Sequence, residues 1–232
     1  MRRPLDQYWQ HYYSDPEVHG RAWLDLSNSQ VQLQSLSLCL ESAGDVLGSA
    51  CADLGCGRGQ LARALKALGA GSVLGVDFVE AVVAANRIGC PEIEWLSGNL
   101  MQPDFMALLP TFDRIFLVEV LQYVDMADAV RAAWGRLRPG GRLVCMVPNE
   151  ACPIVARAIA RFGDCYRAAA PTVVAAIAES LPALAMWAGR GLTFQLDQQL
   201  LPYKVSPWAE RLTFEEPPNR FNIVYVKRAA CP

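Results

Sequence analysis

The sequence lacks the features that mark several large classes of protein. It has only two histidines in 232 residues, and its eight cysteines include no C-x-x-C pair and no spacing to histidine that suits zinc. The formal net charge of −2 offers no basic excess for binding nucleic acid or an anionic membrane. The first residues contain no apolar run of the kind found in signal peptides. We therefore expect a cytoplasmic protein with mostly reduced, buried thiols that binds no nucleic acid.

Long apolar runs are also scarce. The most membrane-like stretch, residues 168–189, is rich in alanine and contains Pro171, Glu179 and Pro182, all of which weaken a membrane-spanning helix. We expect a buried helix or a lid helix at this position, and no stable insertion into a membrane.

The middle of the chain contains a regular alternation of short apolar runs and amphipathic segments. Strands are expected at 50–54, 72–77, 93–96, 113–120 and 142–147, with helices at 60–68, 79–88 and 126–141. This alternation predicts an α/β fold, in which a parallel sheet carries helices on both faces. Such sheets bind ligands at the carboxyl ends of their strands.

The flanking segments differ in composition from this core, but no repeat or low-complexity linker divides the chain. We expect a single domain, 1–232, in four parts: an N-terminal helical cap (1–44), a cofactor-binding core (45–149), a helical lid insert (150–190) and closing strands (191–232). Residues 29–42 fit a strand or a helix, and we predict a helix. The closing strands are expected at 192–203 and 221–228.

Three glycines fill five positions directly after the first expected strand. Residues 52–60 read ADLGCGRGQ, and such a turn before a helix lets a ligand lie against the backbone, where free N–H groups point at it. No Gly-Lys-Ser/Thr follows Gly59, which excludes a P-loop. The G-x-G-x-G spacing also differs from the G-x-G-x-x-G fingerprint of dinucleotide-binding proteins.

Two aspartates accompany the turn: Asp53 precedes it, and Asp77 ends the second strand. A carboxylate at the second position can accept hydrogen bonds from both hydroxyls of a ribose. Asp53 adds a negative charge that repels a pyrophosphate but suits a ligand carrying an ammonium and a sulfonium. The charges therefore favour a cationic nucleoside over NAD or ATP. The alternative is that both aspartates are helix N-caps.

Four segments resemble the class I S-adenosylmethionine-dependent methyltransferases in order and spacing: ADLGCGRG, VLGVDF, FDRIFLVEVLQYV and LRPGGRLVCMVPN. The resemblance implies a Rossmann-like, seven-stranded, mostly parallel sheet whose last strand is antiparallel. It also implies S-adenosylmethionine as cofactor, held by Asp53, Gly55, Cys56 and Gly57 at the methionine portion, Asp77 at the ribose, Phe78 along the adenine, Asn99 and Leu100 at the adenine edge, and Val118 and Glu119 at the amino-acid end. Asn99 stands where the family usually has aspartate, but its carbonyl can still accept a hydrogen bond from the adenine amino group.

Residues 118–124, VEVLQYV, resemble the E-x-x-E-H arrangement that binds a divalent metal in some quinone-pathway O-methyltransferases. Only Glu119 matches, because Gln122 and Tyr123 replace the other two ligands. A carboxylate, an amide and a phenol make a poor magnesium site, so we expect no catalytic metal. Glu119 is instead a candidate catalytic residue in contact with cofactor or substrate, with a purely structural role as the alternative.

The remaining candidates lie in the N-terminal cap. His11 and His19 are the only histidines, and either could be the general base that takes a proton from the acceptor; the alternative is that both are ordinary surface residues. A group of aromatic residues could form the wall of a planar acceptor site, or could fix the cap to the sheet: Tyr8, Trp9 and Tyr12, together with Tyr123.

The sequence thus favours a methyltransferase that acts on a small-molecule hydroxyl or amine in a biosynthetic pathway. A methyltransferase acting on protein or tRNA, and a non-catalytic protein that binds S-adenosylmethionine, are the alternatives. A homodimer is compatible with the sequence. No motif in the cap or the insert identifies the methyl acceptor.

Overall fold

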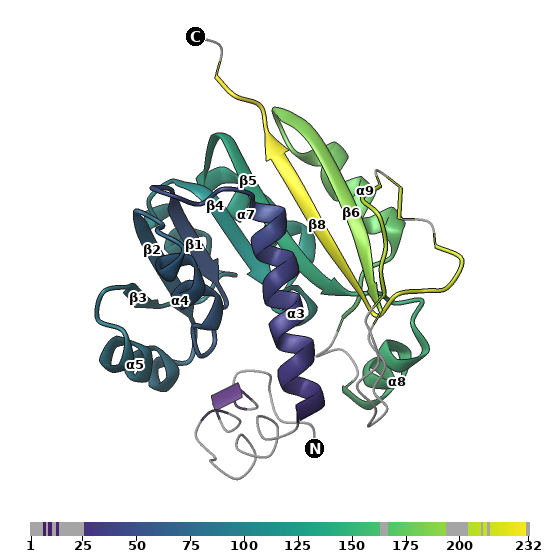
Figure 1. The fold of residues 1–232 in the computed structure, drawn as a ribbon, viewed down its shortest axis with the longest axis horizontal. Helices are drawn as coiled ribbons and strands as arrows, with labels where there is room; N and C mark the ends of the chain where they lie inside the picture. The colour runs from purple at the N-terminus through teal and green to yellow at the C-terminus, as the bar shows by residue number, and fades with distance from the viewer. Residues whose placement is uncertain are drawn as a thin grey trace.

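The computed structural model describes residues 7, 9, 10, 13, 26–162, 167–193, 204–209, 211–212 and 214–230. At its centre is one sheet with the strand order β3-β2-β1-β4-β5-β8-β6-β7 (Figure 1). The strands are β1 (Ala50–Leu54), β2 (Ser72–Asp77), β3 (Glu94–Ser97), β4 (Phe112–Val118), β5 (Leu137–Pro148), β6 (Leu184–Thr193), β7 (Lys204–Val205) and β8 (Arg220–Lys227). The helices are α3 (Leu26–Ala43), α4 (Gln60–Ala67), α5 (Glu80–Gly89), α6 (Pro103–Leu108), the 3₁₀ turn η1 (Leu121–Tyr123), α7 (Met126–Arg136), α8 (Pro153–Phe162) and α9 (Pro171–Ser180).

The sheet is mostly parallel. Strands β1 to β5 pair in parallel, whereas β8 pairs antiparallel with β5 on one side and with β6 on the other. Strand β6 therefore runs in the direction of the parallel set, and the two-residue β7 extends its edge. The predicted Rossmann-like sheet of seven principal strands, with the last strand of the chain antiparallel, is confirmed.

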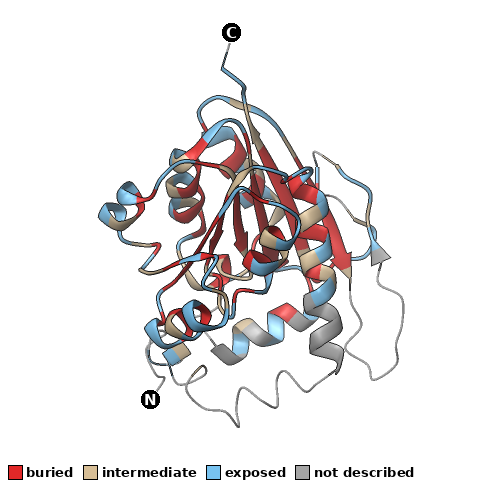
Figure 2. Ribbon diagram, turned by 60° about the vertical axis from the view of Figure 1, so that its left-hand side comes forward, coloured by how far each residue is buried: buried red, intermediate tan, exposed pale blue. Residues whose placement is uncertain are grey.

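Helices cover both faces of the sheet. Helices α3, α4 and α5 contribute to one hydrophobic core, and α6, α7 and α9 contribute to the core on the opposite face. Figure 2 shows the buried strands between helices whose outward faces are exposed. Helix α7 illustrates the pattern, because its buried residues Val130, Ala133 and Trp134 lie three or four positions apart on the inner face. The 29–42 segment lies within α3, so the prediction of a helix there is confirmed.

The predicted helical insert at 150–190 is wrong in its last part. Helices α8 and α9 are present, but Leu184–Thr193 forms strand β6 and pairs with β8 along its length. Alternate side chains of β6 enter opposite cores, Trp187 on one face and Ala188 on the other. The closing strands therefore begin at 184 rather than 191, and residues 194–203 of the expected strand lie outside the described part. No described helix has both the length and the hydropathy needed to cross a membrane.

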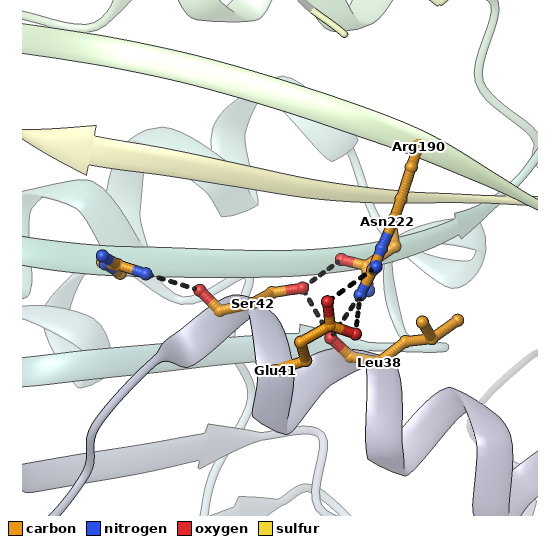
Figure 3. Close-up of polar contacts among 6 residues, drawn as sticks. Leu38, Glu41, Ser42, Arg190 and Asn222 are labelled. Carbon is orange, nitrogen blue, oxygen red and sulfur yellow. Dashed lines mark hydrogen bonds and ion pairs between the residues drawn. The ribbon is translucent and has the colours of Figure 1, made fainter. Parts of the chain in front are cut away.

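Helix α3 is fixed to β6 by a buried arginine (Figure 3). Arg190 donates from Nη1 and Nη2 to the two carboxylate oxygens of Glu41, at 3.0 and 2.8 Å, and from Nη2 to the carbonyl oxygen of Leu38 at 3.4 Å. The Trp208 ring lies 4.5 Å from the guanidinium carbon. This bidentate contact holds α3 against β6.

Replacing this arginine should destabilise the fold. We expect Arg190→Met to lower the free energy of unfolding by about 1–3 kcal/mol, because the Leu38 carbonyl loses a charged donor and α3 loses its tie to β6. Urea denaturation measures the change. The matched control is Arg131→Met on α7, whose exposed pair with Asp128 should contribute less than about 1 kcal/mol. Equal effects of the two variants would contradict this role for Arg190.

Candidate active site

The glycine turn lies at the carboxyl end of β1, between β2 and β4. After β1 the chain continues to β2 and β3 on one side of it, whereas β4 and β5 lie on its other side. Open α/β sheets bind ligands at such a reversal of strand order. Gly55, Gly57 and Gly59 have φ angles of +84°, +50° and +73°, values at which only glycine is unstrained. The sequence pattern of three glycines is thus explained by three left-handed residues in one turn.

Neighbouring elements hold the turn in place. The N–H groups of Gly55 and Cys56 both donate to the carbonyl oxygen of Val76 on β2, at 2.8 Å each. The Asn86 side chain, which is buried on α5, donates from Nδ2 to the carbonyl oxygen of Gly57 at 2.8 Å. Sequence reasoning missed Asn86, because nothing in the helix that carries it indicates a contact with the turn.

A side chain at the third glycine should disrupt the turn. A Cβ on Gly59 would lie 2.3 Å from Cη2 of Trp95, and φ is +73°, so we expect Gly59→Ala to lower the free energy of unfolding by about 2–4 kcal/mol. Gly135→Ala on α7 is the control, since a Cβ there meets nothing within 4 Å and should change stability by at most about +1 kcal/mol. Chemical denaturation compares them, and equal stabilities would refute the steric account.

Asp53 and Asp77 lie on either side of the turn and are both buried. Asp77 accepts hydrogen bonds from the N–H of Gly57 at 2.9 Å and from that of Val79 at 3.0 Å. Asp53 accepts from the N–H of Ala62, and burial raises its pKa to about 7; burial also raises the pKa of Asp77. In the described part of the chain neither carboxylate forms an ion pair. Their charges are therefore available to a cationic ligand.

The interpretation of both aspartates as helix N-caps is wrong. Helix α4 begins after Gly59 and helix α5 after Val79, and these two residues occupy the N-cap positions. The bond between Asp53 and Ala62 does reach the first turn of α4, but from the strand before the glycines.

The residues predicted to bind the adenine lie at the ends of β2 and β3. Phe78 is 38% exposed directly after β2, which leaves its ring accessible, and Leu100 is buried. Asn99 is exposed, and its Oδ1 accepts from the N–H of Met101 at 2.9 Å in a local turn. That oxygen keeps a second lone pair. The adenine contacts of all three residues stay predictions.

Glu119 directly follows β4 and has a strained backbone, with φ at +54°. Its Oε1 accepts from Nε of Arg220 at 2.6 Å, and its Oε2 accepts from Nε2 of Gln122 at 3.1 Å. Left-handed strain in a residue other than glycine costs about 1–3 kcal/mol and is concentrated at functional sites. Sequence reasoning missed Arg220; its only signal is its place after Pro217-Pro218-Asn219, at the start of the last strand.

This arrangement does not suit a divalent cation. Both carboxylate oxygens of Glu119 already accept hydrogen bonds, and the donors are a guanidinium and an amide nitrogen, neither of which binds magnesium. Among the described residues, no group of three or more His, Cys, Asp or Glu side chains could hold a metal ion. The expectation of metal-independent function stays a prediction.

The comparison with protein families decides the class of this core. Residues 52–145, which contain the glycine turn, both aspartates and Glu119, match the family model described as a methyltransferase domain. This part of the chain is therefore similar to methyltransferase domains, and the fold is that of S-adenosylmethionine-dependent methyltransferases.

Relatives of this methyltransferase domain are distant. The ubiquinone biosynthesis O-methyltransferase of Acinetobacter baumannii (strain AYE) is 31% identical over 115 residues, which cover 47% of this chain and 48% of that protein. The chain thus spans about half the length of the curated relatives it matches.

Solved structures show the same fold over nearly the whole chain. The magnesium protoporphyrin IX methyltransferase of Synechocystis PCC 6803 superposes with a TM-score of 0.66 at 16% identity, covering 97% of this chain and 100% of that one. The N-methyltransferase NodS of Bradyrhizobium japonicum has a TM-score of 0.60 at 20% identity, covering 90% and 91% of the two chains.

Aromatic residues from the N-terminal segment reach the methyltransferase site. The ring of Trp9 stands edge-on to that of Tyr123, with 4.8 Å between centroids, and lies 5.9 Å from the ring of Tyr13. The hydroxyl of Tyr13 lies 2.7 Å from the position a Cβ on Gly57 would take. Trp9 and Tyr13 therefore lie between the glycine turn and η1. The other predicted cap residues lie outside the described part of the chain: Tyr8, His11, Tyr12 and His19.

Proposed function

We propose that this protein is an S-adenosylmethionine-dependent methyltransferase that acts on a small-molecule hydroxyl or amine in a biosynthetic pathway, without a metal. The observation that carries the proposal is the pair of buried carboxylates, Asp53 and Asp77, beside a turn of three left-handed glycines. A positively charged nucleoside fits this site because it supplies a positive counter-charge, which neither buried carboxylate obtains from an ion pair with the described residues. A diphosphate would bring further negative charge to them.

The chain's residues have separable roles in this proposal. The glycine turn lets the ligand lie against the backbone, and Asp53 faces the cationic methionine portion. Asp77 accepts from the N–H groups of Gly57, Val79 and Phe78 and keeps one lone-pair site of its carboxylate for the ribose. The cofactor, when bound, supplies a methyl group already activated by a sulfonium. The protein mainly orients the acceptor and excludes water.

A small-molecule acceptor is supported by charge and by the relatives. The net charge of −2 does not favour RNA or DNA as a substrate. The names of similar proteins refer to two small molecules, ubiquinone and magnesium protoporphyrin IX. The aromatic residues Trp9, Tyr13 and Tyr123 offer flat apolar surfaces beside the turn.

Calorimetry tests the proposal. S-adenosylmethionine and S-adenosylhomocysteine should bind at one site per chain, and NAD should bind far more weakly. A radiolabelled methyl group should then pass to a component of a small-molecule extract. Preferential binding of NAD would refute the cofactor assignment. Cofactor binding with no labelled product from any extract would indicate a non-catalytic binding protein instead.

Removing metals should leave this function intact. We expect excess EDTA to change neither the affinity for S-adenosylhomocysteine nor the rate of methyl transfer, because Arg220 and Gln122 already satisfy the Glu119 carboxylate. The same calorimetric titration and the labelled-methyl assay measure both quantities. Loss of transfer that added magnesium restores would overturn the expectation.

A further inference from the structure

The glycine turn uses most of its own N–H groups inside the protein. Those of Gly55 and Cys56 donate to a carbonyl oxygen of β2. The N–H of Gly57 donates to Asp77 at 2.9 Å. The N–H of Gly59 donates to the carbonyl oxygen of Cys56 at 2.8 Å. The expectation that free N–H groups of the turn point at the ligand is therefore wrong for these residues, and an anionic group of a ligand needs a donor from elsewhere.

A hydroxyl from the N-terminal segment lies on the turn. The hydroxyl oxygen of Tyr13 is 2.7 Å from the position that a Cβ on Gly57 would take, so it contacts the backbone there. The N–H of Gly57 points instead to Asp77, and the two contacts thus use different sides of the glycine. Tyr13 and Gly57 are both only partly buried, so each keeps surface that a ligand can touch.

Aromatic contacts hold Tyr13 in this position. Trp9 and Tyr13 are helical residues four positions apart, which places them on one face of their helix. The ring of Trp9 contacts that of Tyr13 and stands edge-on to that of Tyr123. Trp9 and Tyr13 also pack against the core on the face of α3, α4 and α5. The hydroxyl is thus held over the turn in advance, and a preorganised group loses little conformational freedom when a ligand binds.

We propose that the hydroxyl of Tyr13 donates a hydrogen bond to the α-carboxylate of S-adenosylmethionine and so selects a cofactor that carries this group. This inference rests on the proposed methyltransferase function and adds a specificity-determining residue to the same site. The methionine portion is predicted to lie on Gly55 and Gly57, which brings it beside this hydroxyl. Sequence reasoning did not assign Tyr13 to the cofactor.

The charges of the site explain the need for such a donor. The methionine portion carries an ammonium and a carboxylate, and the buried side chains of Asp53 and Asp77 favour the first and repel the second. A phenolic hydroxyl donates to a carboxylate without bringing further negative charge. Arg58 is the competing donor, because it lies within the turn and its side chain is exposed.

Decarboxylated S-adenosylmethionine tests the inference, because it keeps the sulfonium and the amine and lacks only the carboxylate. Calorimetry at a pH above the Asp53 pKa of about 7 compares it with S-adenosylmethionine in the wild type, Tyr13→Phe and Arg58→Gln. We expect Tyr13→Phe to weaken S-adenosylmethionine about tenfold or more and to leave the decarboxylated form within about twofold of the wild type. The matched control is Tyr225→Phe, whose hydroxyl donates to the Val174 carbonyl oxygen in the opposite core and which should change neither affinity.

The outcomes separate this inference from the function on which it rests. Equal losses for the two ligands in Tyr13→Phe, or no loss for either, would overturn the inference and leave the proposed methyltransferase function standing. A loss confined to S-adenosylmethionine in Arg58→Gln, and absent in Tyr13→Phe, would also overturn it and assign the carboxylate to Arg58. Failure of the wild type to bind S-adenosylmethionine would count against both.

Discussion

Asp77→Ala is expected to weaken the binding of S-adenosylhomocysteine by about 100-fold or more. The carboxylate ends β2 beside the glycine turn and is predicted to accept hydrogen bonds from both ribose hydroxyls. Hydrogen bonds to a charged group contribute about 1.5–3 kcal/mol each, and every 1.4 kcal/mol is tenfold in affinity. The variant also removes the bonds from Gly57 and Val79 that hold the turn near β2. Isothermal calorimetry measures the loss.

The matched control for this variant is Asp104→Ala. Asp104 is an exposed acidic residue in the first turn of α6, outside the glycine turn, and its removal should leave the affinity unchanged. Circular dichroism establishes that both variants fold. If folded Asp77→Ala bound within about threefold of the wild type, a difference below 1 kcal/mol, the ribose assignment would be wrong.

The affinity for S-adenosylmethionine should rise steeply between pH 5.5 and 7. Burial raises the pKa of Asp53 from 3.8 to about 7. In the ligand-free protein the Asp53 carboxyl is therefore protonated over most of this pH range. A cationic ligand needs the ionised form, and binding must therefore expel the proton. The expected gain is up to about tenfold per pH unit below the pKa, levelling off above it.

Two controls separate this effect from general acid instability. The neutral nucleoside 5′-methylthioadenosine lacks the charged amino-acid portion and should bind with little pH dependence. Asp53→Asn should bind S-adenosylmethionine more weakly and without the rise. Parallel pH profiles for the two ligands in the wild type would show that Asp53 does not face the cationic part.

The same pKa shift affects stability in the opposite direction. Because the folded protein holds the Asp53 proton more tightly than the unfolded chain does, this residue favours folding most below about pH 4. That contribution is lost as the pH rises to about 7. S-adenosylmethionine should restore stability at pH 7, since it binds only the folded protein.

The core of the fold was predictable because its signals are local. Strands β1 and β2 have the predicted bounds, 50–54 and 72–77. The first apolar run ends before Gly55 of the glycine turn, and the second ends at Asp77, which binds that turn. Strand β6 was not predictable, because the alanine-rich stretch before it, residues 168–178, favours a helix and the expected helical insert was extended to 190. It becomes a strand by pairing with β8, which is distant in sequence. Strand β5 likewise includes the Pro139-Gly140-Gly141 segment that was expected to end a helix at 141.

The site residues likewise include some that lie in local motifs and some that only distant pairing brings together. The glycine turn and Asp77 lie in contiguous motifs, and the sequence locates them directly. The partners of Glu119 differ: Arg220 is 101 residues away, and only the pairing of β8 with β5 brings it near the end of β4. Gln122 stands out in the sequence only as a missing metal ligand. That its side-chain carbonyl finds no donor among the described residues is visible only in the structure.

A crystal structure of the protein grown with both S-adenosylhomocysteine and NAD tests the central claim most directly. The predicted result is the sulfur nucleoside on the glycine turn, with its ribose hydroxyls on the Asp77 carboxylate and its amino-acid portion against Gly55 and Gly57, facing Asp53. A diphosphate lying on that turn, or a nucleoside bound away from both aspartates, would contradict it.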